Sequence, residues 1–449
     1  MNGKVDSSQK RCIVMLEMKP TVSGLPGKPR ARKQLTTLSF VSLIGCLGCG
    51  SVTSTALDAA KPVCSATAGT PKAPAAFAAP APPQAPRCGL PSNIPEPEWP
   101  TTLSSTVGIE RSPMPEDAAT VVLIPDTQYY ASCRYRHLLA QSTWIAQERT
   151  LRRILGAISL GDLTDHNTDD EWSFVKESFA PIGKGFPLML TNGNHDTGSH
   201  GTCDSRDTLL SKYFDQDFAA SSGALRAVKT PGNIENAFYS LRFDTPAKNS
   251  VKIGVLMLEW SPRKSTVDWA NHVLTQYKDH RVIVATHAYL YNDGTRYDYA
   301  TRERDQLWSP LEYLTARDKL GEDQNHDGEM LWNALIRRHP GIFLVVSGHV
   351  LGQGTGRLTS RGDAGNMVHQ ILVNYQMLDE GGLGYLRFFE LYPDGRSLHM
   401  KTYSPSLGLY AYSSDQDFRL EIEPPLFAAP PNASRALPQK TAQAGHTNP

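Results

Sequence analysis

The chain has 449 residues, and 45 Lys and Arg residues balance 45 Asp and Glu residues. This neutral balance does not favour a nucleic-acid partner or an anionic membrane surface. An apolar content of 40% is typical of a globular protein, and the length allows one large domain or two ordinary ones. Composition alone does not identify a substrate.

The first 49 residues resemble an export signal. A basic cluster at 28–33 precedes an apolar, small-residue segment from Leu35 to Gly45 that is too short to span a bilayer comfortably. Leu43-Ile44-Gly45-Cys46 resembles the bacterial lipobox, in which the cysteine receives a lipid. We therefore expect an exported, extracytoplasmic protein that is lipid-anchored to a bacterial membrane. The alternative is a disordered tail whose apolar stretch is accidental.

Composition also predicts the domain boundaries. Ala and Pro dominate the segment after the signal, and the prolines prevent a stable helix, so we predict a disordered linker over 50–115. A single folded domain follows over 116–423, and 424–449 is predicted to be a disordered tail.

The domain alternates apolar runs with helical patterns, which is typical of an α/β protein. Five short apolar runs predict strands that are buried on both faces, and two further strands lie at 237–243 and 251–259. Helices are predicted near 138–151, 169–179, 266–277 and 330–336. Three strands separated by a turn at Pro393-Asp394-Gly395 are expected to complete a second sheet: 367–373, 384–392 and 398–403.

Polar side chains stand where each of the five buried runs ends. Such loops gather along one rim of a sheet, where ligands bind. Carboxylates, imidazoles and an amide oxygen in one place suit Mn, Fe, Zn or Mg. The sequence therefore predicts a metal site built from Asp126-Thr127-Gln128, Gly161-Asp162-Leu163-Thr164-Asp165, Gly193-Asn194-His195-Asp196, His287 and Gly348-His349.

In order, spacing and strand context, these stretches resemble the calcineurin-like metallophosphoesterase superfamily, over about 121–349. The resemblance implies a four-layer α/β/β/α sandwich of two mixed β-sheets flanked by helices. It also implies two divalent metal ions. Asp126 and Asp162 would hold the first, with Asp162 bridging, and Asn194, His287 and His349 would complete the second.

The resemblance further implies a role for His195 as a protonated imidazole near the leaving group, oriented by a carboxylate such as Asp196. Asp165 matches a position that supports the loop. The implied activity is metal-dependent hydrolysis of phosphate esters, as a phosphatase or phosphodiesterase, by a metal-activated water. The expected partner is a phosphate-ester substrate, with membrane contact only through the lipid anchor and no nucleic acid.

Two departures from the family pattern concern the first metal. Gln128 stands where the family usually has His, and Leu351 replaces the second His of its Gly-His-x-His motif. The first position then keeps two carboxylates and a Gln oxygen, which favours Mg or Mn, or it borrows a group such as Asn374 or Gln376. The alternative function is a catalytically degenerate, surface-anchored binding lipoprotein that keeps the phosphoesterase fold.

Two further features left alternatives open. The polar segment from Tyr291 to Gln324 lies between two donor loops, so it either overhangs the site or is a plain surface loop. Cys133 and Cys203 both follow donor strands, and in an oxidising compartment they would form a disulfide or remain two thiols.

Overall fold

The computed structural model describes residues 102–245, 250–302, 305–317, 323–352 and 354–426. The predicted signal and lipobox lie outside these residues, as do most of the predicted linker and tail. Within the described residues, no helix combines the length and the apolar character that crossing a membrane requires.

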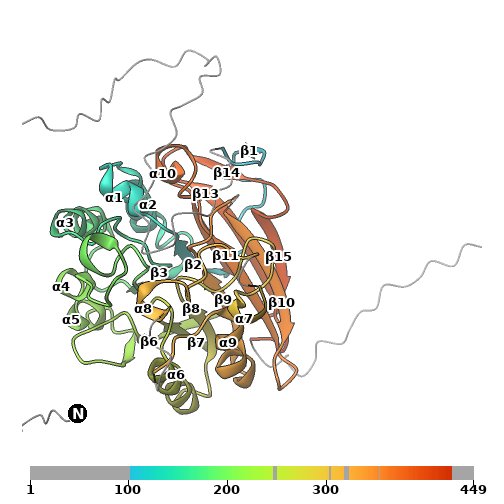
Figure 1. Cartoon of the computed structure of the whole chain (residues 1–449). Coiled ribbons are helices and arrows are strands. Elements are labelled where there is room, and N and C mark those ends of the chain that lie inside the picture. The colour runs from blue at the N-terminus through green and yellow to red at the C-terminus, as the bar shows by residue number, and fades with distance from the viewer. Residues whose placement is uncertain (1–101, 246–249, 303–304, 318–322, 353, 427–449) are drawn as a thin grey trace, which may run out of the picture. The chain divides into compact units, whose positions relative to one another are not determined.

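Two mixed β-sheets form the centre of the domain (Figure 1). The first sheet has eight strands in the order β1-β14-β13-β12-β2-β3-β4, with β15 paired to β13. In it, β2, β3 and β4 run parallel, and the strands near the C-terminus are antiparallel. Its strands are β1 Val107–Gly108, β2 Ala119–Ile124, β3 Ile154–Ser159, β4 Leu188–Met189, β12 Leu386–Leu391, β13 Ser397–Ser404, β14 Leu409–Ala411 and β15 Asp417–Glu421.

The second sheet has seven strands in the order β10-β11-β9-β8-β7-β6-β5. Its four central strands, β7, β8, β9 and β11, are parallel, which places their carboxyl ends at one edge. Its strands are β5 Leu225–Val228, β6 Ala237–Asp244, β7 Ser250–Met257, β8 Arg281–Ala285, β9 Ile342–Ser347, β10 Thr355–Arg361 and β11 Met367–Val373.

The sheets pack face to face because alternate residues along each strand point to opposite sides. On β7, Val255 and Met257 join the core shared with the first sheet, while Leu256 faces the opposite way. The same alternation places Ile283 of β8 inside and Val284 outside. Both faces of the second sheet are therefore covered by apolar side chains.

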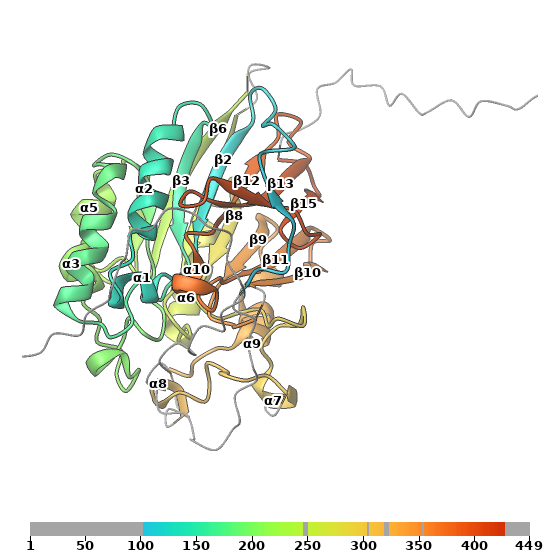
Figure 2. The same ribbon diagram turned by 90° about the horizontal axis from the view of Figure 1, so that it is seen from above.

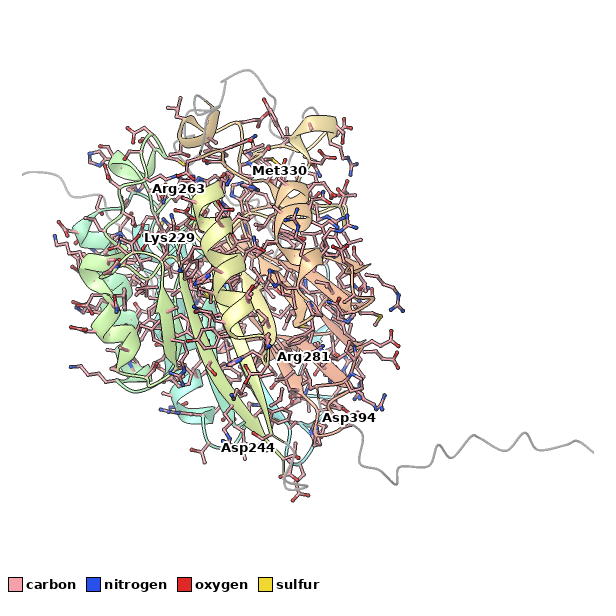
Figure 3. The ribbon with its side chains drawn as sticks, turned by 90° about the horizontal axis from the view of Figure 1, so that it is seen from below. Lys229, Asp244, Arg263, Arg281, Met330 and Asp394 are labelled. Carbon is pink, nitrogen blue, oxygen red and sulfur yellow. The ribbon has the colours of Figure 1, made fainter. Side chains whose placement is uncertain are left out.

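Helices cover the outer faces of the two sheets (Figure 2). Trp144 of α2 packs against Phe388 of β12, with ring centroids 5.5 Å apart. On the other side, α6 and α9 bury Val267, Val273 and Leu331 against the second sheet, and Figure 3 shows α6 lying along that sheet from Arg263. The helices are α1 Gln128–Ser132, α2 His137–Glu148, α3 Asp169–Ser178, α4 Leu210–Tyr213, α5 Gln216–Ala220, α6 Lys264–Gln276, α7 Tyr299–Arg302, α8 Leu314–Arg317, α9 Gly328–Ala334 and α10 Asp379–Gly382, with 3-10 turns at Ala180–Ile182, Ser199–Gly201 and Ile336–Arg338.

The predicted α/β/β/α sandwich of two mixed sheets flanked by helices is thus confirmed. All five buried runs form strands, and β8 has the predicted bounds, although β4 is only two residues long. The expectation that the C-terminal strands complete one sheet is wrong. β11 joins the second sheet, whereas β12 and β13 join the first, because β12 pairs with β2.

Ordered structure begins inside the range predicted as linker. β1 pairs with β14, and Glu110 accepts hydrogen bonds from Arg152 and Lys401. Among the described residues, the disulfide hypothesis is not supported, since both cysteines are thiols. Cys203 is buried with its Sγ 3.5 Å from Oγ1 of Thr315, and Sγ of Cys133 lies 4.0 Å from Oγ of Ser132.

Candidate metal centre

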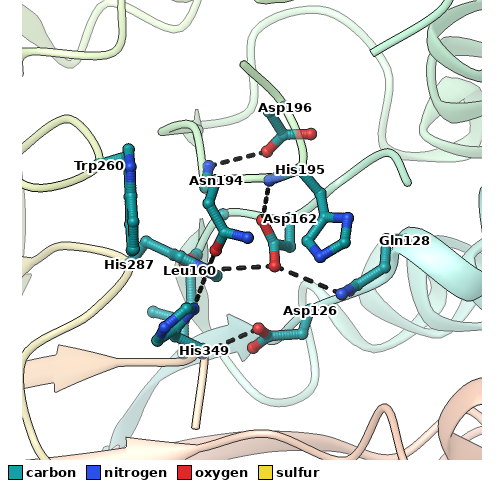
Figure 4. Close-up of polar contacts among 12 residues, drawn as sticks. Asp126, Gln128, Leu160, Asp162, Asn194, His195, Asp196, Trp260, His287 and His349 are labelled. Carbon is teal, nitrogen blue, oxygen red and sulfur yellow. Dashed lines mark hydrogen bonds and ion pairs between the residues drawn. The ribbon is translucent and has the colours of Figure 1, made fainter. Parts of the chain in front are cut away.

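The site lies where the carboxyl ends of the parallel strands of both sheets meet. Asp126 follows β2, Asp162 follows β3 and His349 follows β9, and all three have positive φ angles of 29°, 50° and 73°. This left-handed backbone turns the chain sharply at each strand end. The five sequence-predicted loops therefore converge, and Figure 4 shows their side chains in one cluster.

Two glycines allow this close approach. A Cβ on Gly193 would lie 2.1 Å from Oδ1 of Asp162, and a Cβ on Gly348 would lie 2.2 Å from Oδ2 of Asp126. Both distances are far below van der Waals contact. These positions require glycine because a carboxylate occupies the space of a side chain.

The two imidazoles are fixed by backbone carbonyls. Nδ1 of His287 donates to the carbonyl of Leu160 at 2.7 Å, and Nε2 of His349 donates to the carbonyl of Trp308 at 2.9 Å. A neutral imidazole has one N–H, so these bonds leave Nε2 of His287 and Nδ1 of His349 as acceptors. The two atoms face each other at 3.2 Å.

Two oxygens complete this group. Oδ1 of Asn194 and Oδ2 of Asp162 each lie 3.1 Å from Nε2 of His287. The ligand atoms of Asp162, His287 and His349 all lie within 4.8 Å of one another, and the three residues are buried. Lone pairs that converge in a buried site need a cation or a shared proton between them. This Asp/His/His group can therefore hold a metal ion.

The local charges agree with this geometry. Burial alone would lower the pKa of His287, but Asp162 outweighs it and raises the pKa to about 9. Burial and the charge of His287 lower the pKa of His349 to about 3. Burial would raise the pKa of Asp162, yet His287 and His195 bring it to about 2. The carboxylate is thus kept ionised, and positive charge is stabilised beside it.

Asp126 and Gln128 lie on the other side of Asp162. Oδ1 of Asp126 accepts from the backbone N–H of His349 at 2.8 Å, while Oδ2 is buried and has no hydrogen-bond partner among the described residues. The side-chain amide of Gln128 lies 3.3 Å from Oδ2 of Asp162. A second group of oxygen atoms therefore shares Asp162 with the imidazole group.

The structure changes the roles expected of two carboxylates. Nδ1 of His195 lies 3.1 Å from the carbonyl and 3.2 Å from Oδ1 of Asp165, so Asp165 orients the ring. The expectation that Asp196 does so is wrong. Asp196 accepts the backbone N–H groups of Leu163, Thr164 and Gly193 at 2.8–3.1 Å, and so ties two donor loops together.

His195 itself is held close to the bridging carboxylate. Its backbone N–H donates to Oδ1 of Asp162 at 2.9 Å. Burial alone would lower the pKa of its imidazole, but Asp162 and Asp165 outweigh burial and raise the pKa to about 10. The imidazole is therefore protonated at neutral pH in this environment, which is the state that a proton donor needs.

Known proteins give limited comparison. No family model matches the chain. YvnB of Bacillus subtilis (strain 168), described as an uncharacterized protein, is 28% identical over 300 residues, which cover 65% of this chain and 20% of YvnB. The chain thus spans about a fifth of the length of that relative.

Two solved structures have a related course of the chain. GAP50, the anchor in the inner membrane complex of Plasmodium, has a TM-score of 0.39 at 13% identity, covering 69% of this chain and 90% of its own. The NAD nucleotidase NadN of Haemophilus influenzae has a TM-score of 0.33 at 11% identity, covering 68% and 50%. Similarities this low carry no argument about function.

Sequence reasoning missed the aromatic wall of the site. The ring of Trp260, which follows β7, lies 5.0 Å from that of His349 and 5.5 Å from that of His287. Tyr313 packs edge-on against Trp260 at 5.0 Å. Tyr313 and Trp308 both belong to the polar segment 291–324, so this segment contacts the site. The position of Trp260 after an apolar strand was the available signal.

Proposed function

We propose that the protein is a metal-dependent hydrolase of phosphate esters with a dinuclear site, a variant of the calcineurin-like metallophosphoesterases. The observation that carries the proposal is the convergence of acceptor atoms on both sides of Asp162. Nε2 of His287, Nδ1 of His349 and Oδ1 of Asn194 lie on one side, and Asp126 and Gln128 lie on the other. Asp162 is the bridging ligand in this arrangement.

Two divalent metal ions, of Mn, Fe, Zn or Mg, would supply Lewis-acid stabilisation of the phosphoryl oxygens and an activated water. The chain supplies the remaining functions. The backbone N–H of His195 holds Asp162 in its bridging orientation. Leu160 and Trp308 hold the imidazoles in the tautomers that present lone pairs to the site.

His195 is the group that we assign to the leaving oxygen. Its ring is tied at Nδ1 to Asp165, which leaves the proton at Nε2 for the departing alkoxide. Because Asp162 and Asp165 keep the ring charged, it can also stabilise negative charge on the phosphoryl group. Asp196 acts indirectly, by fixing the loops that carry Asp162 and His195.

The substitution Asp162→Asn tests the proposal. It keeps the shape of the side chain but removes the charge shared by both positions, so bound metal and turnover of chromogenic phosphate mono- and diesters should fall by more than about 100-fold. Asp217→Asn, at an exposed carboxylate of α5, is the matched control and should leave both unchanged. Equal activity of the two variants would refute the assignment.

A catalytically degenerate, surface-anchored binding protein is the second candidate. It is favoured by the absence of imidazole from the Asp126 side, where the contacting group is the amide of Gln128. Metal analysis of the purified protein, combined with a substrate panel in added Mn, Mg or Zn, separates the two. Bound metal without turnover on any phosphate ester would favour the binding protein.

We further propose that the protein is exported and lipid-anchored through Cys46. The proposal rests on the basic cluster at 28–33 and on the lipobox-like Leu43-Ile44-Gly45-Cys46. Labelling with a radioactive fatty acid in a bacterial host should mark the wild type and not Cys46→Ala. Equal labelling of both proteins would contradict lipidation at this cysteine.

A further inference from the structure

The Asp126 side of the site contains a second amide that comes from another part of the chain. Gln376 follows β11, which is parallel to β9, so its loop reaches the same edge of the second sheet. Its Oε1 lies 3.0 Å from the side-chain amide of Gln128, although 248 positions separate the two residues. Gln128 is fully buried and Gln376 is only 8% exposed.

The orientation of the Gln128 amide follows from its neighbours. When its nitrogen donates to the backbone carbonyls of Asp126 and Asp162, both at 3.3 Å, its oxygen accepts from Nε2 of Gln376 at 3.2 Å. This orientation satisfies both atoms of the amide. The oxygen then occupies the place 3.3 Å from Oδ2 of Asp162 and 3.0 Å from Oε1 of Gln376.

The orientation of Gln376 is set by Asn374. Nδ2 of Asn374 donates to Oε1 of Gln376 at 3.0 Å, and the backbone N–H of Gln376 donates to Oδ1 of Asn374 at 2.9 Å. Asn374 is itself fixed, since its backbone N–H donates to the carbonyl of Gly354 at 3.1 Å. Oε1 of Gln376 is thereby held facing Gln128.

These contacts gather oxygen atoms around one point. Oδ2 of Asp162, Oε1 of Gln128 and Oε1 of Gln376 are neighbours at 3.0–3.3 Å, and Oδ2 of the adjacent Asp126 has no partner among the described residues. Ligands at about 2.1 Å in octahedral geometry are about 3.0 Å apart. The spacing therefore fits a small hard cation, whose charge would also compensate the unpartnered Asp126 oxygen.

We propose that Gln376 is a ligand of the first metal position and, with Gln128, replaces the two imidazoles that the family pattern places there. The inference rests on the proposed dinuclear site. It makes the first position an oxygen-only site, made of Asp126, Gln128, Asp162 and Gln376, that takes Mg²⁺ or Mn²⁺. The second position, with two imidazoles, takes a more strongly bound borderline metal such as Zn²⁺.

The test measures metal binding rather than activity. Metal-free protein is loaded with one equivalent of Zn²⁺, and Mn²⁺ is then titrated while the electron paramagnetic resonance signal of free Mn²⁺ is recorded. We expect one Mn²⁺ site in the wild type. Gln376→Leu should weaken it by about tenfold or more and leave the Zn²⁺ stoichiometry unchanged. Gln147→Leu, at an exposed glutamine of α2, is the control for the substitution itself.

A second variant covers the case in which Gln376→Leu fails to fold. Gln376→Glu adds a charge at the same place, so it should tighten Mn²⁺ binding relative to the wild type. Mn²⁺ affinity within about twofold of the wild type in both variants would overturn the assignment, even if phosphate esters are still hydrolysed. If instead Mn²⁺ binding responds as expected but no phosphate ester is turned over, the metal ligand stands and the proposed enzyme activity falls.

Discussion

Replacing Glu259 with Gln should destabilise the fold by up to about 3 kcal/mol at neutral pH. Glu259 follows β7 and is 3% exposed. Its Oε2 accepts from Nη2 of Arg263 at 2.8 Å and lies 3.4 Å from Nη1 of Arg206, and its Oε1 accepts from the hydroxyl of Thr266. Arg206 in turn donates to the carbonyl of Trp260 at 2.7 Å, so this network holds the loop that packs on the two imidazoles.

The magnitude comes from the pKa of the carboxyl group. Burial alone would raise the pKa of Glu259, but Arg206 and Arg263 outweigh it and lower the pKa from 4.5 to about 2. A change of this size corresponds to about 3 kcal/mol. Burial lowers the pKa of Arg206 despite its contact with Glu259, so the carboxylate figure is an upper value for the network. Removing the charge also leaves the Arg206 guanidinium buried without a carboxylate.

Urea unfolding followed by tryptophan fluorescence at a series of pH values measures the effect. Because the folded pKa is depressed, the stabilisation is complete above 4.5 and is lost as the pH falls toward 2. The difference between wild type and Glu259→Gln should therefore shrink by about 1.4 kcal/mol per pH unit in that window. A difference that stays constant from neutral pH to about pH 3.5 would refute the linkage between Glu259 and stability.

Three further predictions concern the site. Asp165→Asn should lower the pKa of His195, now raised to about 10, and so move the alkaline limb of the kcat profile to lower pH; an unmoved limb contradicts the orienting role. Gly348→Ala places a methyl 2.2 Å from Oδ2 of Asp126, so Mn²⁺ affinity should fall by about tenfold in the titration above, and wild-type affinity would show that the carboxylate is not a ligand. Chelation should lower the free energy of unfolding by about 3 kcal/mol at metal concentrations about 100 times Kd, and a melting curve insensitive to chelation and to added Zn²⁺ would contradict metal binding by the native fold.

The sequence predicted the strands that carry the donor loops because burial on both faces leaves a strong pattern. Arg281–Ala285 is apolar almost throughout, and it forms β8 with the same bounds. The polar residue after each run then lies at the edge of the sheet, which is why Asp126, Asp162 and His349 could be placed together from sequence. Strand pairing was harder to predict, because the antiparallel pairing of β12 with β2 depends on a long connection.

The contacts within the loops could not be predicted. In Gly193-Asn194-His195-Asp196, neighbouring side chains point in different directions, so the residue beside His195 in sequence contacts the Leu163 and Thr164 backbone instead. Trp308 contributes a backbone carbonyl, which no residue type signals. Gln376 could be suggested from its place after β11, but its contact with Gln128 depends on two loops far apart in the chain.

The bond between His349 and Trp308 links substrate entry to the metal centre. One imidazole is tied to Leu160 at the end of β3, a strand inside the sheet, whereas the other is tied to a connection between β8 and α9. A substrate that pushes this connection aside must supply a new acceptor for Nε2 of His349, or that ring is released to rotate. Substrates that leave the Trp308 carbonyl in place should therefore be processed with the metal still firmly held, and bulky ones should loosen it, so size selection and metal retention share one hydrogen bond.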